Sequence, residues 1–264
     1  MIYYSNAKIN IGLNVLSKRE DGYHNINSFF YPIPLSDILE VVPAKGYNKI
    51  NVSYSGLIQY IENDLIVKAY DILSKNHKIP SISVHLHKNI PIGSGLGGGS
   101  SNAAHILKIL NRLFSLDLSI AELISYSKKI GSDCPFFIIN SCSLISGVGD
   151  VIKPLNFRLD FDFIVILKPN NILSTKDVFK NFHLNKNTNP YNKDDVKNLY
   201  SLKNDLESTS EKICSEIRDC KKVLKKMGAT YISMTGSGSA VYGFFNKKPI
   251  VPKRIKYWCW TSKL

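Results

Sequence analysis

The eleven residues from Pro91 to Ser101 constrain the fold of this chain more than any other stretch, because five of them are glycines. Polar and apolar residues alternate over 81–88, as in a half-buried strand, and apolar residues recur at helical spacing over 102–114. Glycine admits backbone conformations that point successive N–H groups inward, and it has no Cβ to block a ligand. The following helix N-terminus adds unpaired N–H groups and the positive end of its dipole. The segment therefore predicts an anion site suited to phosphate.

Several known phosphate motifs can be compared with this segment. A P-loop requires Lys after its last glycine, but this chain has Ser100-Ser101 there, so that motif is excluded. The spacing of Gly93-Ser-Gly-Leu-Gly-Gly98 matches the dinucleotide fingerprint, which also needs an acid about 20 residues later, after a second strand. Asp117 lies near that distance, but between two helical patterns, and no protein-kinase motif follows the loop. A flexible linker would not usually join a strand to an apolar helix, so phosphate binding of another kind is favoured.

The composition limits the possible number of domains, the kinds of partner and the compartment of the chain. At 264 residues with 44% hydrophobic residues, the chain can form one large domain or two joined ones. The net charge of +13 raises the possibility of nucleic-acid binding. However, the lysines are dispersed, and a solvated basic surface that helps recruit polyphosphates is favoured. The five cysteines have no framework spacing, and no apolar run has the length of a spanning helix. We therefore expect a cytoplasmic protein with no nucleic-acid or membrane partner.

An early strand pattern carries two candidate polar residues. Apolar residues over 7–15 fall on one face, which places Lys8 and Asn10 together on the other. The pattern alone also allows both to be ordinary solvent-facing residues. An Asp-Gly turn follows and predicts a hairpin that returns Tyr23 and His24 to the end of this strand. By itself, that pair is also typical of a half-buried strand start.

Three later features leave alternatives open. Asp133 lies between Gly131, which suits the end of a helix, and Pro135, which prevents that helix from continuing. Its carboxyl is either a partly buried acid of tunable pKa or a cap of the turn. A second glycine turn, Thr235-Gly-Ser-Gly-Ser239, either approaches a ligand or closes a tight hairpin. The tail after Phe245 shows little helical pattern.

Four segments together resemble the GHMP kinases, over roughly residues 5 to 245. They are the glycine segment with the helix start, 91–104; Ala7-Lys-Ile-Asn10 with Asp21-Gly-Tyr-His24; Gly131-Ser-Asp-Cys-Pro-Phe-Phe137; and Thr235-Gly-Ser-Gly-Ser239. The resemblance implies an α+β, two-lobed GHMP kinase fold. Residues 1–150 would form a ribosomal-S5-like lobe that binds the nucleotide. Residues 151–264 would form a ferredoxin-like lobe that contributes to substrate binding.

The combination of segments is similar to the branch of this family that acts on a CDP-linked polyol. It implies phosphorylation, by ATP with Mg²⁺, of the 2-hydroxyl of CDP-methylerythritol (4-diphosphocytidyl-2-C-methyl-D-erythritol) in non-mevalonate isoprenoid synthesis. In that resemblance, Asp133 accepts the hydroxyl proton and Lys8 stabilises charge. A different GHMP kinase, such as homoserine kinase, and a basic RNA-binding protein are the alternatives.

The resemblance also implies the binding residues, for a chain that is a monomer or a homodimer. The nucleotide would contact Pro91, Ile92, Gly93, Ser94, Gly95, Leu96, Gly97, Gly98, Gly99, Ser100 and Ser101, together with Lys88 and Asn63. The second substrate would contact Asn10, Tyr23, His24, Thr175 and Phe179, with Tyr23 and Phe179 on the two faces of cytosine. No metal ligands are assigned, and Ser100 and Ser101 are the candidates beside the phosphates.

Overall fold

A computed structural model describes residues 1–47, 49–58, 60–185 and 188–264, and it has the α+β composition that the sequence predicts. The strands are β1 (Ile2–Lys18), β2 (His24–Tyr47), β3 (Ile50–Gly56), β4 (Pro80–Lys88), β5 (Ser143–Ser146), β6 (Val151–Pro154), β7 (Phe163–Lys168), β8 (Tyr231–Met234), β9 (Val241–Phe245) and β10 (Trp258–Lys263). The helices are α1 (Leu65–Ser74), α2 (Gly98–Leu113), α3 (Ile120–Lys128), α4 (Cys134–Ile139), α5 (Thr175–Asn181), α6 (Glu207–Ile213) and α7 (Glu216–Lys226). Short 3₁₀ turns, η1 (Asp195–Lys197) and η2 (Leu199–Ser201), precede α6.

The chain forms two compact units that are interleaved in sequence. Unit 1 contains Met1–Ala7, Leu35–Pro91 and Gly97–Ser141, and unit 2 contains Lys8–Pro34, Ile92–Leu96 and Cys142–Leu264. This division does not coincide with a single boundary near residue 150. The first half of the chain supplies two segments of unit 2, so neither unit is a continuous stretch of sequence.

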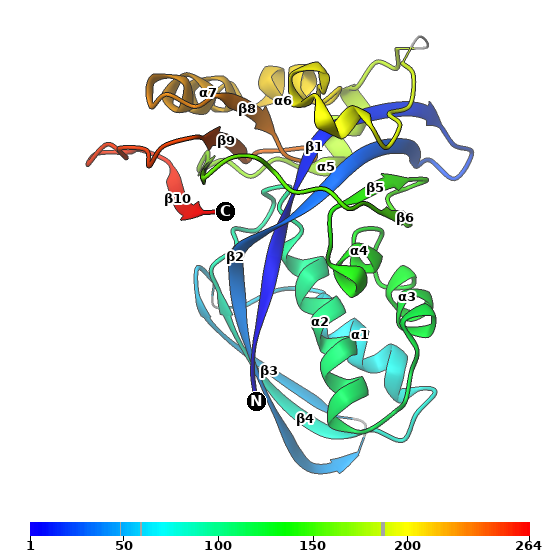
Figure 1. The fold of residues 1–264 in the computed structure, drawn as a ribbon. Helices are drawn as coiled ribbons and strands as arrows, with labels where there is room; N and C mark the ends of the chain where they lie inside the picture. The colour runs from blue at the N-terminus through cyan, green and yellow to red at the C-terminus, as the bar shows by residue number, and fades with distance from the viewer. Residues whose placement is uncertain (48, 59, 186–187) are drawn as a thin grey trace. The chain divides into compact units, whose positions relative to one another are not determined.

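Unit 1 is a sheet with helices on one side (Figure 1). Strand β3 runs parallel to β4, and β4 pairs antiparallel with β2 from Ile38 onward. The side chain of Asp64 caps α1 by accepting a hydrogen bond from the Ile66 N–H at 2.9 Å. Ser119 and Glu122 form a reciprocal capping box at the start of α3. Local sequence therefore fixes where these two helices begin.

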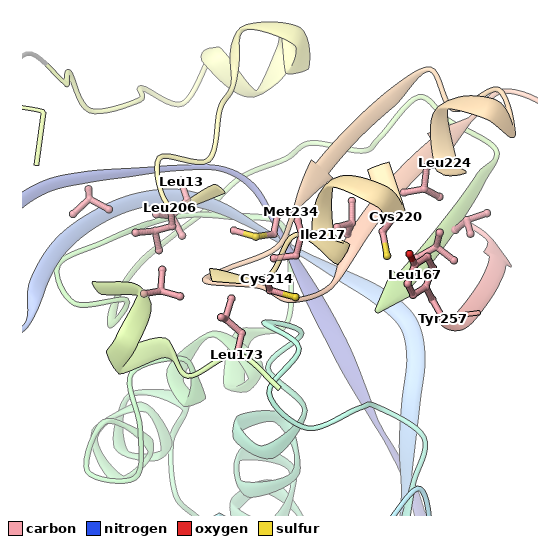
Figure 2. Packing of buried hydrophobic residues seen from close by; sticks show 14 of the residues in the cluster. Leu13, Leu167, Leu173, Leu206, Cys214, Ile217, Cys220, Leu224, Met234 and Tyr257 are labelled. Atoms are coloured by element: carbon pink, nitrogen blue, oxygen red, sulfur yellow. The ribbon is translucent and has the colours of Figure 1, made fainter. Parts of the chain in front are cut away.

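Unit 2 is built on an antiparallel sheet of order β10-β7-β9-β8. Residues Ile164 to Leu167 of β7 are fully buried, as expected for a central strand that is apolar on both faces. Figure 2 shows how Ile217 and Leu224 of α7 meet Leu167 and Met234 in the core of this unit. The sheet is thus covered by α7 and stabilised by burial of its apolar face.

Strand β10 is an element that the sequence pattern did not indicate. It pairs antiparallel with β7, from Trp258 opposite Lys168 to Lys263 opposite Phe163. Residues 246–257, all of which the structure describes, contain no helix. The resulting β-α-β-β-β order is a ferredoxin-like plait without its second crossover helix.

None of the helices in the described part of the chain is long and apolar enough to cross a bilayer.

Candidate active site

The glycine segment connects β4 to α2, as the sequence predicts. Gly93, Gly95 and Gly97 have φ values of 61°, 76° and 73°, in the region that favours glycine. Gly97 is the N-cap residue of α2, and no side chain caps the helix there. This 16-residue helix therefore begins without a side-chain cap, a condition that favours binding of an anion at its N-terminus.

Only part of this segment can meet a ligand. Gly93 and Gly99 are exposed, as is Ile92. Pro91, Gly95, Gly97 and Ser100 are half-buried, and Ser94, Leu96, Gly98 and Ser101 are buried. The Ser101 hydroxyl donates to the Asn6 carbonyl oxygen at 2.6 Å. Gly93, Gly99 and the half-buried Ser100 therefore stay candidates for contact with a phosphate.

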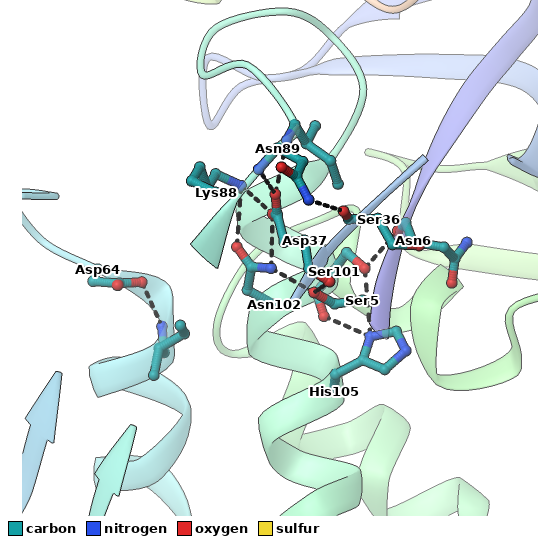
Figure 3. A network of polar contacts seen from close by, with 12 residues as sticks. Ser5, Asn6, Ser36, Asp37, Asp64, Lys88, Asn89, Ser101, Asn102 and His105 are labelled. Atoms are coloured by element: carbon teal, nitrogen blue, oxygen red, sulfur yellow. Dashed lines mark hydrogen bonds and ion pairs between the residues drawn. The ribbon is translucent and has the colours of Figure 1, made fainter. Parts of the chain in front are cut away.

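Lys88, which the resemblance places near the nucleotide, lies beneath the start of α2. Its side chain is 2% exposed, forms an ion pair with Asp37, and donates to Asn102 Oδ1 at 3.2 Å (Figure 3). A Cβ added to Gly98 would lie 2.9 Å from Lys88 Nζ. Burial lowers the pKa of Lys88, and the neighbouring Asp37 opposes that shift. Lys88 therefore supports the first turn of α2 from below.

Asp37 is the centre of this network and was missed from the sequence. One carboxylate oxygen accepts the N–H groups of Asn89 and Ile90, each at 2.8 Å. The other accepts from Asn102 at 2.9 Å and from Lys88. The sequence signal that could have indicated Asp37 is an acidic residue inside the apolar pattern of β2. The partners of Asp37 could not be found in this way, because they lie far along the chain.

Lys8 and Asn10 are both buried, so the solvent-facing interpretation of their strand face is wrong. Each is 2% exposed. Lys8 Nζ lies 2.6 Å from Asn10 Oδ1 and 3.1 Å from the Gly95 carbonyl oxygen, and 4.4 Å from the centre of the Phe30 ring. Both faces of β1 are covered here, which the alternating pattern of a single strand cannot reveal. The ammonium is thus tied to the glycine segment within unit 2.

The two glycine turns of the chain are in contact. A Cβ on Gly95 would overlap the Thr235 carbonyl oxygen, and the Ala240 N–H donates to the Ser94 carbonyl oxygen at 3.1 Å. The turn between β8 and β9 therefore approaches the first glycine segment, in addition to closing a hairpin.

Asp133 is half-buried at the start of α4, in unit 1. Its side chain makes no cap hydrogen bond to that helix. The preceding helix, α3, ends before Pro135, as expected, and Pro135 lies in the first turn of a new helix, α4, where no N–H is needed.

The Asp133 turn lies beside the start of α2. The Cys134 thiol is hydrogen-bonded to Ser100, and a Cβ on Gly131 would lie 4.0 Å from Ser100 Oγ. Burial raises the pKa of the Cys134 thiol to about 12, so it stays protonated. Within unit 1, the predicted base thus neighbours the helix N-terminus that closes the glycine segment.

The residues predicted to bind cytosine lie in unit 2. His24 stacks on Phe179, with ring centroids 4.9 Å apart and planes at 24°. Tyr23 is 64% exposed. The Thr175 hydroxyl lies 2.8 Å from that of Ser237, a residue absent from the predicted site. Burial, and then Lys18, lowers the pKa of His24, so its imidazole is neutral at neutral pH.

Asn63 precedes α1 and is exposed, with φ of 53°. The adjacent Asp64 caps α1, and burial raises the pKa of its carboxyl. A Cβ on Gly99 would lie 3.8 Å from Leu65 Cδ1, so the start of α1 lies beside the start of α2. This neighbourhood is compatible with the predicted place of Asn63 near a nucleotide.

No group of three or more His, Cys, Asp or Glu side chains that could hold a metal ion occurs among the residues described.

Comparison with known proteins relates this geometry to a family. Residues 64–141 match the model of the GHMP kinases N terminal domain, and residues 192–258 match that of the GHMP kinases C terminal. The 4-diphosphocytidyl-2-C-methyl-D-erythritol kinase of Azobacteroides pseudotrichonymphae is 43% identical over 261 residues, covering 96% of each chain. The chain belongs to the 4-diphosphocytidyl-2-C-methyl-D-erythritol kinase family. The kinase of that name from Cytophaga hutchinsonii is 41% identical over 94% of each chain.

Solved structures agree with membership of this kinase family. A crystal structure of 4-(cytidine 5'-diphospho)-2C-methyl-D-erythritol kinase has a TM-score of 0.78 at 29% identity, covering 92% of this chain and 90% of that one. The Methanococcus jannaschii mevalonate kinase has a TM-score of 0.67 at 12% identity, covering 93% and 90%. The second likeness extends the shared fold to the wider GHMP kinases.

Proposed function

We propose that this chain catalyses the ATP-dependent phosphorylation of the 2-hydroxyl of 4-diphosphocytidyl-2-C-methyl-D-erythritol. The observation that carries the proposal is the similarity, at 43% identity over 96% of the chain, to a kinase named for this substrate. The glycine segment and the uncapped start of α2 are consistent with a triphosphate site. The step belongs to non-mevalonate synthesis of isoprenoid precursors.

Asp133 and Lys8 carry the proposed chemistry. The Asp133 carboxylate accepts the proton of the 2-hydroxyl, and the Lys8 ammonium stabilises the negative charge on that oxygen. Phosphoryl transfer depends mainly on positioning and on neutralised charge, so a base and a cation suffice beside the phosphate site. The proposal is supported by a half-buried Asp133 that does not cap its helix and by a desolvated, well-partnered Lys8.

Cytosine recognition is assigned to Tyr23, His24 and Phe179. Tyr23 presents an exposed ring on which a neutral base can stack. A neutral His24 imidazole can donate with one nitrogen and accept with the other, which suits the cytosine edge. Asn10 is proposed to contact the methylerythritol moiety of the substrate. Thr175, also assigned to the substrate, lies near Ser237 in unit 2 of the protein.

The nucleotide is assigned to the glycine segment, with Asn63 on the adenosine side. Lys88 is so deeply buried that support of the loop suits it better than direct contact. Mg²⁺ would neutralise charge on the phosphates, and it usually takes one or two protein oxygens beside them. The Ser100 hydroxyl fits that role better than Ser101, whose hydroxyl donates to Asn6.

A coupled assay of ADP release tests the proposed function. Purified protein, with its folding verified by circular dichroism, receives ATP, Mg²⁺ and one acceptor: the CDP-linked substrate, homoserine or mevalonate. We expect turnover with the first acceptor alone, with one phosphate gained by mass spectrometry. Turnover with homoserine and none with the CDP-linked substrate would instead indicate another GHMP kinase activity.

A further inference from the structure

The Thr235 side chain lies within the Lys8 network but has no place in the chemistry described so far. Thr235 is fully buried at the start of the turn between β8 and β9. Its hydroxyl oxygen accepts the Asn10 main-chain N–H at 3.0 Å. The same oxygen lies 3.1 Å from Asn10 Oδ1 and 3.1 Å from the Gly95 carbonyl oxygen. All of these residues belong to unit 2.

The Lys8 ammonium uses the same two acceptors. Lys8 Nζ donates to Asn10 Oδ1 at 2.6 Å and to the Gly95 carbonyl oxygen at 3.1 Å. The Thr235 hydroxyl and the ammonium therefore contact one pair of oxygen atoms. These two oxygens, together with the Phe30 ring, therefore help to set where the charge of Lys8 lies.

Neighbouring hydrogen bonds fix the orientation of the Asn10 amide in this network. The Ser28 hydroxyl donates its one proton to the Gly12 carbonyl oxygen at 2.5 Å, so it accepts from Asn10 Nδ2 at 3.0 Å. The Asn10 amide is therefore oriented with Oδ1 toward Lys8. Because Thr235 Oγ1 already accepts the Asn10 N–H, its own proton goes to one of the two shared oxygens.

We infer that Thr235 is a positioning residue: its hydroxyl accepts the Asn10 N–H and donates its one proton to Asn10 Oδ1 or to the Gly95 carbonyl oxygen, and so helps to place the two oxygens that bind the Lys8 ammonium. The inference rests on the proposed catalytic role of Lys8. Thr235 acts through these two oxygens and does not touch substrate. It also joins the second glycine turn to the phosphate segment, through a hydrogen bond that a valine of the same shape cannot make.

Thr235→Val tests this inference, because it keeps the shape and removes the hydroxyl. The change leaves the buried Asn10 N–H without an acceptor and frees the two oxygens to shift. A misplacement of about 1 Å costs on the order of 100-fold in rate, so we expect kcat to fall by roughly 10- to 100-fold. The KM for ATP should change much less than kcat, because the first turn of α2 is untouched. Thr235→Ser, which retains the hydroxyl, should keep kcat within about threefold of wild type.

A matched control separates positioning from simple loss of a buried hydroxyl. Thr209 is 9% exposed in α6 of the same unit and lies outside the network. Thr209→Val should leave kcat and both KM values near wild type. All variants are compared by thermal melting, and Thr235→Ala, which adds no bulk, replaces Thr235→Val if the latter does not fold.

A double-variant cycle with Lys8→Met decides whether Thr235 acts through Lys8. The Thr235→Val change should have little further effect on the residual kcat of Lys8→Met. An equal loss in both backgrounds, or a Thr235→Ser variant as defective as Thr235→Val, would overturn the inference. Full activity of Thr235→Val together with an inactive Lys8→Met would also overturn the inference. That result would leave the proposed role of Lys8 intact. Wild-type activity of Lys8→Met alone would instead refute the proposed role of Lys8.

Discussion

Asp133 is the residue on which the proposed reaction depends most directly. Asp133→Asn removes the base but keeps its size, so kcat should fall by about 10² to 10⁴. Binding of ATP should survive, because the glycine segment and the first turn of α2 are unchanged. Isothermal titration with a non-hydrolysable ATP analogue, beside steady-state kinetics, measures both quantities.

An exposed acid in the same unit supplies the control for Asp133. Asp117 is exposed with φ of 52°, a conformation that Asn also tolerates. Asp117→Asn should therefore leave kcat and stability near wild type. If Asp133→Asn abolished nucleotide binding while Asp117→Asn did not, Asp133 would be a structural residue and the proposed base would be wrong.

The limits of sequence reasoning are visible at single residues. The pattern of β1 shows that Lys8 and Asn10 share a polar face. Their burial depends on Phe30, Gly95 and Thr235, which are distant in the sequence. Asp37 is a comparable case, since its partners belong to β4 and α2. Chemistry-bearing residue types can thus be identified from sequence, whereas the contacts that orient them are tertiary.

At the scale of elements, the Asp37–Lys88 pair couples β2, β4 and the start of α2. Asp37→Asn leaves the Lys88 ammonium buried without its counter-charge, and we expect the free energy of unfolding to fall by about 3 to 5 kcal/mol. Urea unfolding followed by circular dichroism measures the loss. Asp219→Asn, at an exposed pair with Lys222, should change stability far less.

A double substitution distinguishes charge from hydrogen bonding in this network. Asp37→Leu with Lys88→Met removes both charges, so stability should recover relative to Asp37→Asn. Recovery should be partial, because the N–H groups of Asn89 and Ile90 also lose their acceptor. A single Asp37→Asn variant as stable as wild type would show that the ion pair contributes nothing.

Helix α2 also carries a histidine that makes stability depend on pH. Burial, and then Lys108, lowers the pKa of His105 to about 4, and its Nδ1 lies 2.8 Å from the Ser101 carbonyl oxygen. The unfolded chain binds a proton below pH 6.5, whereas the folded chain does so only near pH 4. Stability from this group is therefore fully present above pH 6.5 and is lost as the pH falls toward 4.

Replacement of His105 should reduce this acid sensitivity. Between pH 7.5 and 4.5 the wild type should lose about 2 to 3 kcal/mol more unfolding free energy than His105→Gln. Urea titrations at both pH values measure the difference. His183→Gln, at an exposed histidine, should lose as much as wild type. Equal losses in His105→Gln and wild type would refute the assignment.

Elements defined by local sequence were the most predictable parts of the fold. The strand, glycine segment and helix over 80–113 depend on neighbouring residues, and the structure confirms them. Strand β10 was not found, because Trp258–Lys263 becomes a strand through pairing with β7. Helix α4 was also missed, because Pro135 was interpreted only as preventing the preceding helix from continuing, and it also occupies the first turn of α4.

At the scale of the whole molecule, ligand binding should appear as added stability. A ligand that binds only the folded chain adds about 2.7 kcal/mol at 100 times its Kd. We therefore expect a non-hydrolysable ATP analogue with Mg²⁺ to raise Tm by several degrees in differential scanning fluorimetry. NAD should give no shift, because the dinucleotide fingerprint lacks its acid. A shift with NAD and none with the ATP analogue would contradict the triphosphate assignment.

The interleaving of the two units has a consequence for how such a chain can be altered by recombination. Residues 8–34 and 92–96 belong with the C-terminal half, so the path passes between the units after residues 7, 34, 91, 96 and 141. A single genetic crossover anywhere between residues 8 and 141 would combine segments of one unit from two different parents. Exchange of a whole unit would require several simultaneous crossovers, which favours inheritance of this chain as one piece.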